Sequence, residues 1–280
     1  MRHNYLNNRD LLKEIHLSKM TYSSYRDREK DNMYDIILNS IKEINETSIQ
    51  KAKQNRMARI LQETGNTIEI SSISTQDLIF RVMTWEHIPL LEKKEEAKKL
   101  NVDTFFTRIE KDKPEEEDEI DFIFLNKKEK AKHVKINFPP FEHYRLDENE
   151  KPFVVAKSHW QGDLNTGKFC CTHGYFTDNF AQMLMKLVEK YALRGNWRNY
   201  SYRDEMEGQA IMQLCQVALQ FDESKSLNPF AYLTQVGYCS FLRILGIEKR
   251  HQKIRDDLLI QQNHTPSYTR TNDDTSFGEN

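Results

Sequence analysis

The chain has 280 residues, a formal net charge of -2, a hydrophobic content of 38%, a charged content of 30% and a mean hydropathy of -0.78. It contains no apolar run of the roughly 20 residues that a membrane-spanning helix needs, and its N-terminus lacks the apolar core of a signal peptide. The composition therefore predicts a helix-rich cytoplasmic protein of one large domain or two modest ones.

Residues 1–65 are predicted to form an N-terminal helical segment. An Asn cap in the run from Asn4 to Asp10 precedes Leu11, Leu12 and Ile15, which have helical spacing. Residues 31–61 continue the helical pattern with isolated isoleucines among polar residues. Gly65-Asn66 is expected to end it.

Residues 66–176 have a different residue composition and are predicted to be an inserted mixed α/β or β-rich module. β-branched and aromatic residues gather at 67–71, 78–83 and 122–125, and these runs are predicted to be strands. Between them, residues 91–100 favour a solvated helix. Residues 111–119 are so rich in charge that a mobile loop is expected.

Residues 177–262 are the most regular part, and they make the predicted fold mainly α. Thr177 caps a helix whose apolar residues recur every three or four positions from Phe180 to Tyr191. Ser201 to Asp204 resembles a capping box before a second helix with a stripe from Met206 to Phe221. Asn228-Pro229 begins a third helix with a charged extension. Residues 263–280 are polar, and disorder is predicted there.

Specific runs carry a resemblance to a known family. Residues 220–235 read QFDESKSLNPFAYLTQ, residues 4–12 read NYLNNRDLL, and a tryptophan stands at Trp197. These runs resemble region 2 of bacterial sigma factors and, in detail, the late-transcription sigma factor of T4-like bacteriophages. The resemblance implies a sigma region 2-like helical bundle at 177–262 and leaves the module at 66–176 unexplained.

The resemblance implies a surface for RNA polymerase on the second helix of the bundle. In that family the helix binds the clamp helices of the largest subunit of host core RNA polymerase, a coiled coil with charged and apolar surface. The matching positions are Glu205, Gly208, Gln209 and Gln213. By composition alone the same residues fit an ordinary solvated helix face.

The resemblance also implies a surface for promoter DNA. Phe221 and Tyr232 match the rings around the flipped adenine of the −10 element, and stacking contributes roughly 1–3 kcal/mol per base. Gln235 could contact a base edge. A basic run follows, for which phosphate contacts are predicted: Arg243, Lys249, Arg250, Lys253 and Arg255. By composition alone both rings could be core residues, and the charged helix could simply be solvated.

The chain also departs from the family pattern. Housekeeping sigma factors have a tryptophan pair where this chain has Gln235 and Val236. This loss points to the phage branch and to dependence on an AT-rich promoter and a late coactivator. The tail from Asp273 to Asn280 offers one aromatic residue, Phe277, as an anchor for the phage sliding clamp, which is a weak version of the family motif. Nothing after Arg255 resembles a domain that reads the −35 element.

Three other readings remain open. Cys170, Cys171 and His173 could be half of a metal site, but no second pair follows at the usual spacing, so neither metal nor cofactor is expected. An enzyme such as a nuclease in the inserted module could use His133, His143, His159 and His173, although no nuclease spacing is present. An adaptor or inhibitor could bind polymerase without reading DNA.

The leading prediction is therefore a non-enzymatic, late-promoter sigma factor. It would bind host core polymerase and an AT-rich, −10-like element in the cytoplasm of the infected bacterial host.

Overall fold

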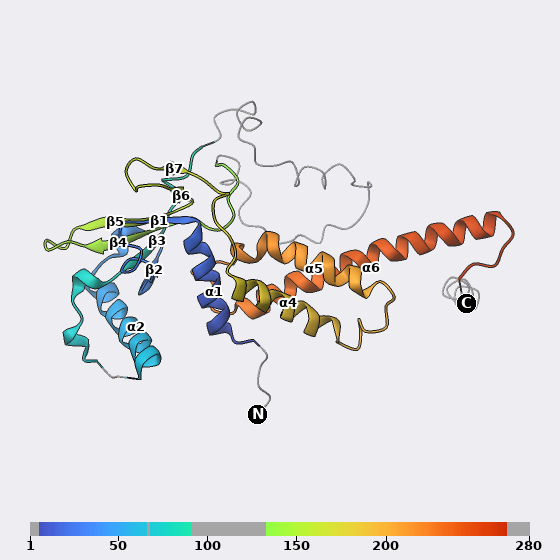
Figure 1. Ribbon diagram of the computed structural model, residues 1–280, viewed down its shortest axis with the longest axis horizontal. Helices are drawn as coiled ribbons and strands as arrows, with labels where there is room; N and C mark the ends of the chain where they lie inside the picture. Colours follow the sequence, from blue (N-terminus) through green and yellow to red (C-terminus); the bar gives the residue numbers. More distant parts are fainter. Residues whose placement is uncertain (1–5, 66–67, 91–132, 268–280) are drawn as a thin grey trace, which may run out of the picture. The chain divides into compact units, whose positions relative to one another are not determined.

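The computed structural model describes residues 6–65, 68–90 and 133–267. The chain divides into two compact units (Figure 1). One contains residues 1–15 and 177–280, and we call it the helical unit. The other contains residues 16–176, and we call it the sheet unit. Helix α1 (Asn8–Thr21) spans the first boundary between them.

The sheet unit is built on a mixed five-stranded sheet with the order β1-β5-β4-β3-β2. Strands β2 and β3 are parallel, and the other neighbours are antiparallel. Strands β6 and β7 form a separate antiparallel pair. The bounds are β1 Ser23–Tyr25, β2 Ile36–Leu38, β3 Phe80–Met83, β4 Phe141–Leu146, β5 Pro152–Ser158, β6 Trp160–Gln161 and β7 Lys168–Phe169.

The prediction for the N-terminal segment is wrong in one respect. Residues 36–38, expected to be helical, form β2 and pair with residues 80–82 of β3. The two apolar residues Ile36 and Leu38 are nearly buried in the sheet, so tertiary pairing overrides the helical spacing of the isoleucines. The predicted boundary at 65/66 consequently falls inside the sheet unit. Strand formation predicted at 67–71 is also wrong for the described part, because Ile70–Ser72 is a short 3-10 helix.

Helix α2 (Glu46–Thr64) covers one face of the sheet. It begins at a capping box between Asn45 and Ser48 and ends at Gly65, whose φ of 73° suits glycine. The core of this face contains Phe80, Val82, Tyr144 and Leu146 together with Ala52 of α2. Short 3-10 helices at Ile41–Glu43 and Thr75–Asp77 complete the unit.

The opposite face of the sheet holds a buried polar cluster around Arg81. Arg81 Nε donates to His143 Nε2 over 3.1 Å, and Arg81 Nη2 lies 2.8 Å from His16 Nδ1. The rings of Tyr34 and Phe141 each lie 3.9 Å from the guanidinium carbon. The alternation of side chains along β3 therefore separates an apolar face from a polar one.

The helical unit contains α4 (Asp178–Ala192), α5 (Arg203–Val217), a 3-10 turn (Ala218–Gln220) and α6 (Pro229–Gln261). The predicted apolar stripes are confirmed, since Phe180, Leu187, Met206 and Leu214 are fully buried. Thr177 caps α4 and Asn228 caps α6, as predicted. The capping box predicted at Ser201 is wrong, because the N-cap of α5 is Tyr202 and makes no side-chain cap bond.

The first turns of α1 belong to the helical unit through two contacts. Asn8 Oδ1 accepts a hydrogen bond from Phe230 N over 3.0 Å at the start of α6. Thr177 Oγ1, at the N-cap of α4, donates to Glu14 Oε2 over 2.6 Å. The N-terminal residues thus satisfy groups at the beginning of two helices that lie more than 160 positions later in the chain.

Helix α6 has 33 residues and, over one 18-residue window, a mean hydropathy of 1.2. By length and composition it could cross a membrane, contrary to the expectation from sequence. Its Leu233 and Phe241 are fully buried in the helical unit, and a core helix meets the same criterion. After α6 the chain turns back, and Ser267 binds the buried Asp256 through its amide (2.9 Å) and its hydroxyl (2.7 Å). Residues 263–267 are therefore ordered against α6.

The predictions for residues 91–100, 111–119, 122–125 and 268–280 lie outside the described residues.

Candidate functional site

Helix α5 presents one face to solvent and buries the other. Met206, Ala210 and Leu214 are fully buried, while Glu205 and Gly208 are exposed and Gln209 is half-buried. Glu205, Gly208 and Gln209 are three or four positions apart, so they share a face, which we call the α5 outer face. Gln213, the fourth residue predicted to bind polymerase, is half-buried at the edge of this face.

The α5 outer face includes an apolar residue that the sequence reasoning missed. Met212 follows Gly208 by four positions and is 44% exposed. An exposed methionine among polar residues is an adaptable contact point for a protein partner. The signal was present in the sequence, since Met212 breaks the polar pattern of this face.

One face of α6 contains most of the residues predicted to bind DNA. Tyr232, Gln235, Arg243, Arg250 and Lys253 follow one another at spacings that keep them on one side of the helix. All of them are exposed except Tyr232, which is half-buried. We call this side the α6 basic face. It extends about 32 Å along the helix at 1.5 Å per residue.

Two predicted phosphate ligands do not share this face fully. Lys249 is exposed at its border, whereas Arg255 lies on the other side of α6, on the side that carries the buried Leu233 and Gly237 farther up the helix. The sequence reasoning grouped the five basic residues by their distance along the chain. The helical period separates Arg255 from the other four.

The two predicted base-stacking rings pack on each other in the structure. Phe221 is 3% exposed, and its ring centroid lies 5.5 Å from that of Tyr232. Tyr232 Oη donates to Val217 O over 2.9 Å, and burial raises the pKa of Tyr232 to about 12. In this conformation the ring of Phe221 is part of the core at the α5–α6 junction, so its stacking on a base stays a prediction that requires the ring to leave the core.

The turn between these helices is ordered by short polar side chains. Asp222 Oδ1 accepts from Ser224 N and Oγ, and Asp222 forms an ion pair of 3.0 Å with Lys225. These bonds lower the pKa of Asp222 despite the cost of its burial. Leu227, at 76% exposure, projects from this turn next to the start of the α6 basic face.

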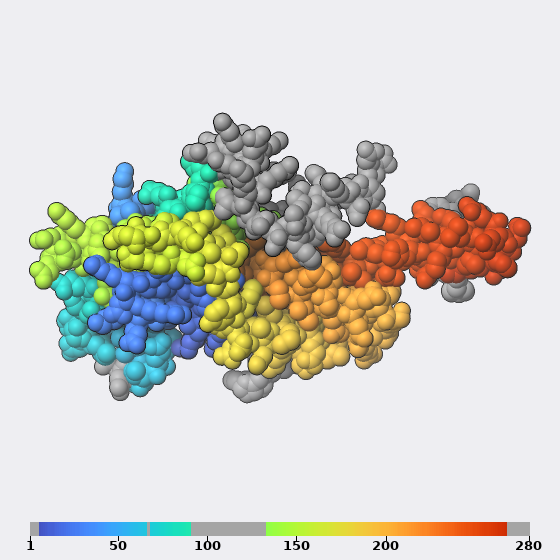
Figure 2. Space-filling view, turned by 45° about the horizontal axis from the view of Figure 1, so that its top comes forward, coloured from blue at the N-terminus to red at the C-terminus, as the bar shows by residue number. Residues whose placement is uncertain are grey.

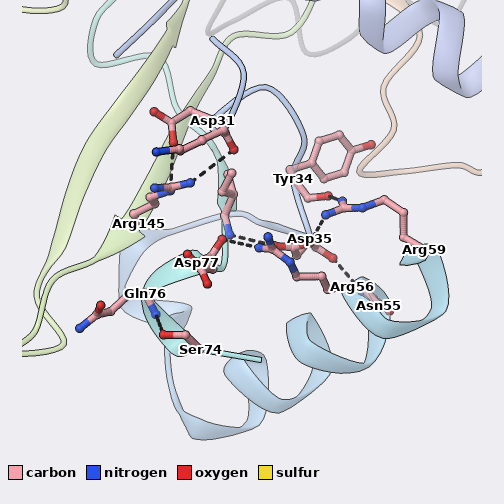
Figure 3. A network of polar contacts seen from close by, with 12 residues as sticks. Asp31, Tyr34, Asp35, Asn55, Arg56, Arg59, Ser74, Gln76, Asp77 and Arg145 are labelled. Atoms are coloured by element: carbon pink, nitrogen blue, oxygen red, sulfur yellow. Dashed lines mark hydrogen bonds and ion pairs between the residues drawn. The ribbon is translucent and has the colours of Figure 1, made fainter. Parts of the chain in front are cut away.

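The sheet unit contains a cleft of about 510 Å³ beside α2. Figure 3 shows its arginines tied to two buried carboxylates. Asp35 binds Arg59 over 2.7 Å and Arg56 over 3.4 Å, and Asp31 binds Arg145 over 2.9 Å. Exposed acids at Glu29, Glu63 and Asp77 also line the cleft. Because these acids and the buried pair offset the cations, the arginines are best explained as attachments of α2 and β4 to the loop that precedes β2.

Two of the four histidines proposed for an enzyme lie in the interior of the sheet unit. His143 and His159 are fully buried, so a substrate cannot reach them. His133 is half-buried and its ring centroid lies 5.1 Å from that of Trp85.

The cysteines of the possible metal site make other contacts. Cys171 Sγ lies 3.7 Å from Lys135 O, and burial raises the pKa of its thiol to about 12. Among the described residues, no group of three or more His, Cys, Asp and Glu side chains is arranged to hold a metal ion.

No family model matches the chain, and no curated protein or solved structure is similar to it at a significant level.

Proposed function

We propose that the protein is a promoter-specificity factor of the phage late sigma type. It binds host core RNA polymerase through the α5 outer face and an AT-rich −10-like element through the α6 basic face. It acts in the cytoplasm of the infected bacterial host and has no catalytic site of its own.

One observation carries the proposal. The two runs that resemble the phage sigma family, residues 4–12 and 220–235, are separated by more than 200 residues. They nevertheless belong to one compact unit, in which Asn8 Oδ1 accepts a hydrogen bond from Phe230 N at the start of α6. A chance resemblance of two short runs would not require them to meet in space.

The two faces have the chemistry that the proposal needs. A polymerase coiled coil offers mixed charged and apolar surface, which suits Glu205, Gln209 and the exposed Met212. A separated DNA strand offers phosphates and unstacked bases, which suit Arg243, Arg250 and Gln235.

The burial of Phe221 favours a second candidate, a polymerase-binding adaptor without promoter recognition. A ring that is 3% exposed must leave the core before it can stack on a base. The two candidates share the α5 outer face and differ in whether DNA binds α6.

The test is binding of the full chain to purified host core polymerase, followed by transcription from a supercoiled template with an AT-rich −10-like element. Binding with initiation at that element is expected. Binding without initiation would favour the adaptor. Absence of binding would overturn both candidates.

Glu205→Lys tests the α5 outer face. Reversing an exposed charge in the interface is expected to weaken polymerase binding at least tenfold, because like charges then oppose each other. Glu189→Lys makes the same change at an exposed position of α4 and is the matched control. Equal affinities of the two variants would remove α5 from the interface.

A further inference from the structure

The apolar face of α6 continues beyond the part of the helix that packs on its neighbours. Residues on this face recur with a period of seven, in two series that alternate at spacings of three and four. The first series is Leu233, Ser240, Ile247, Ile254 and Gln261, and the second is Gly237, Ile244, His251 and Leu258. We call this face the α6 seam.

The first half of the seam is buried and the second half is not. Leu233 and Ser240 are at most 4% exposed, whereas Ile254 and Leu258 are each 52% exposed. Figures 1 and 2 show the last part of α6 projecting beyond α4 and α5.

The ordered tail covers a different side of the helix. Ser267 binds Asp256, and its hydroxyl accepts from Gln252 Nε2 over 3.0 Å. Neither Gln252 nor Asp256 is a seam position. The second half of the seam has the apolar period that is typical of a packed helix. Within the described residues, no other helix packs on it. An isolated helical extension of about 14 residues is marginal in water.

We propose that the second half of the α6 seam pairs with the same segment of a second copy of this chain, in antiparallel orientation about Ile254. In this arrangement His251 of each copy packs near Leu258 of the other. The residues that flank the seam decide the orientation. Arg250 of one helix lies beside Asp257 of the other, which gives two symmetric ion pairs.

A parallel pair would be disfavoured by charge. It would place Arg250 of one helix beside Arg255 of the other, twice, and would gain only the pairing of Arg243 with Glu248 at the near end of the extension. The antiparallel pair brings only Arg255 near its own copy at the axis. The seam is short, so the dimer belongs to the weak, transient class.

Disulfide trapping tests the geometry in the full chain, with Cys215→Ser and Cys239→Ser to remove the native cysteines of the helical unit. Ile254→Cys is expected to form a 254–254 disulfide, identified by mass spectrometry, at least tenfold faster than Lys249→Cys, which lies on the far side of α6. Equal rates would overturn the proposal.

Sedimentation equilibrium tests the ion pairs. Asp257→Arg is expected to weaken dimerisation at least fivefold, and Arg250→Asp with Asp257→Arg is expected to restore it, because the swap recreates both pairs. A wild-type protein that sediments as a monomer at about 300 µM, or a charge swap that does not restore dimerisation, would overturn the inference. Neither experiment uses DNA or polymerase, so its failure leaves the proposed function untouched.

Discussion

The buried cluster around Arg81 fixes the protonation of its histidines. His16 Nε2 lies 2.8 Å from Asn32 O and His143 Nδ1 lies 3.0 Å from Asp31 O, so these nitrogens carry the protons and donate. The other ring nitrogens accept from Arg81. Burial, followed by the charge of Arg81, holds the pKa of both histidines well below the ordinary value of 6.5. Burial lowers the pKa of His159 to about 3.

These residues make the sheet unit sensitive to mild acid. Below pH 6.5 these histidines bind protons in the unfolded chain but stay neutral in the native one. The free energy of unfolding therefore falls as pH decreases. Each such histidine contributes a loss of about 1.4 kcal/mol at one pH unit below its unfolded pKa. The urea midpoint is therefore expected to fall between pH 7.0 and 5.5.

The variant His143→Gln isolates one of these groups, since an amide can still accept from Arg81 and donate to Asp31 O. Its stability is expected to depend less steeply on pH than that of the wild type. A midpoint that stays constant between pH 7.0 and 5.5 would contradict the prediction. The raised pKa of Asp35 and Glu142 acts in the opposite direction, and the test stays above the range where carboxyl groups usually titrate.

At the scale of the element, the surroundings of α6 differ from one side of the helix to the other and from its first half to its second. Its buried side packs on α4 and α5, and its basic face is exposed on a different side. The helical spacing of residues 229–244 and the cap at Asn228 were predictable from sequence, because both are local signals. Strand β2 was not predictable in this way, because three residues become a strand only when β3 is beside them.

The α6 basic face gives a prediction about salt dependence. Arg250→Ala with Lys253→Ala is expected to weaken promoter binding and to reduce the slope of log affinity against log salt by about 1.4 to 1.8, since each lost phosphate contact removes about 0.7 on a single strand and about 0.9 on a duplex. Filter binding or fluorescence anisotropy over a salt series measures the slope.

Arg255→Ala is the matched control, because Arg255 lies on the opposite side of α6 and is exposed, as Arg250 and Lys253 are. Its slope is expected to equal that of the wild type. If Arg255→Ala lowers the slope as much as the double variant does, DNA does not bind along the face defined by Tyr232 and Lys253.

At the scale of the whole molecule, the sheet unit is inserted into the sequence of the helical unit, and α1 belongs to both units. The helical unit is left at Ile15 and re-entered at Thr177, and the side chains of Glu14 and Thr177 are hydrogen bonded to each other. The two points at which the chain leaves and re-enters the helical unit are therefore close in space, so a short linker can join them.

Replacing residues 16–176 by a short Gly-Ser linker is expected to give a chain that unfolds cooperatively and retains helical circular dichroism. If the proposed function is correct, it binds core polymerase within threefold of the full chain, because α5 and α6 remain intact. A shortened chain without cooperative unfolding would show that the helical unit depends on the sheet unit. A folded chain that loses binding would place the polymerase contact in the sheet unit.

The sequence by itself determined the helices of residues 178–261, the N-caps of α4 and α6 and the buried stripes, because capping and helical period are local properties. It also located Glu205, Gly208 and Gln235 on exposed surface. Only the tertiary structure decided that Phe221 is buried against Tyr232 and that residues 36–38 join a sheet with residues 80–82. The reason is the same in each case: burial and strand pairing depend on residues that are distant in the sequence, whereas composition and spacing report only near neighbours.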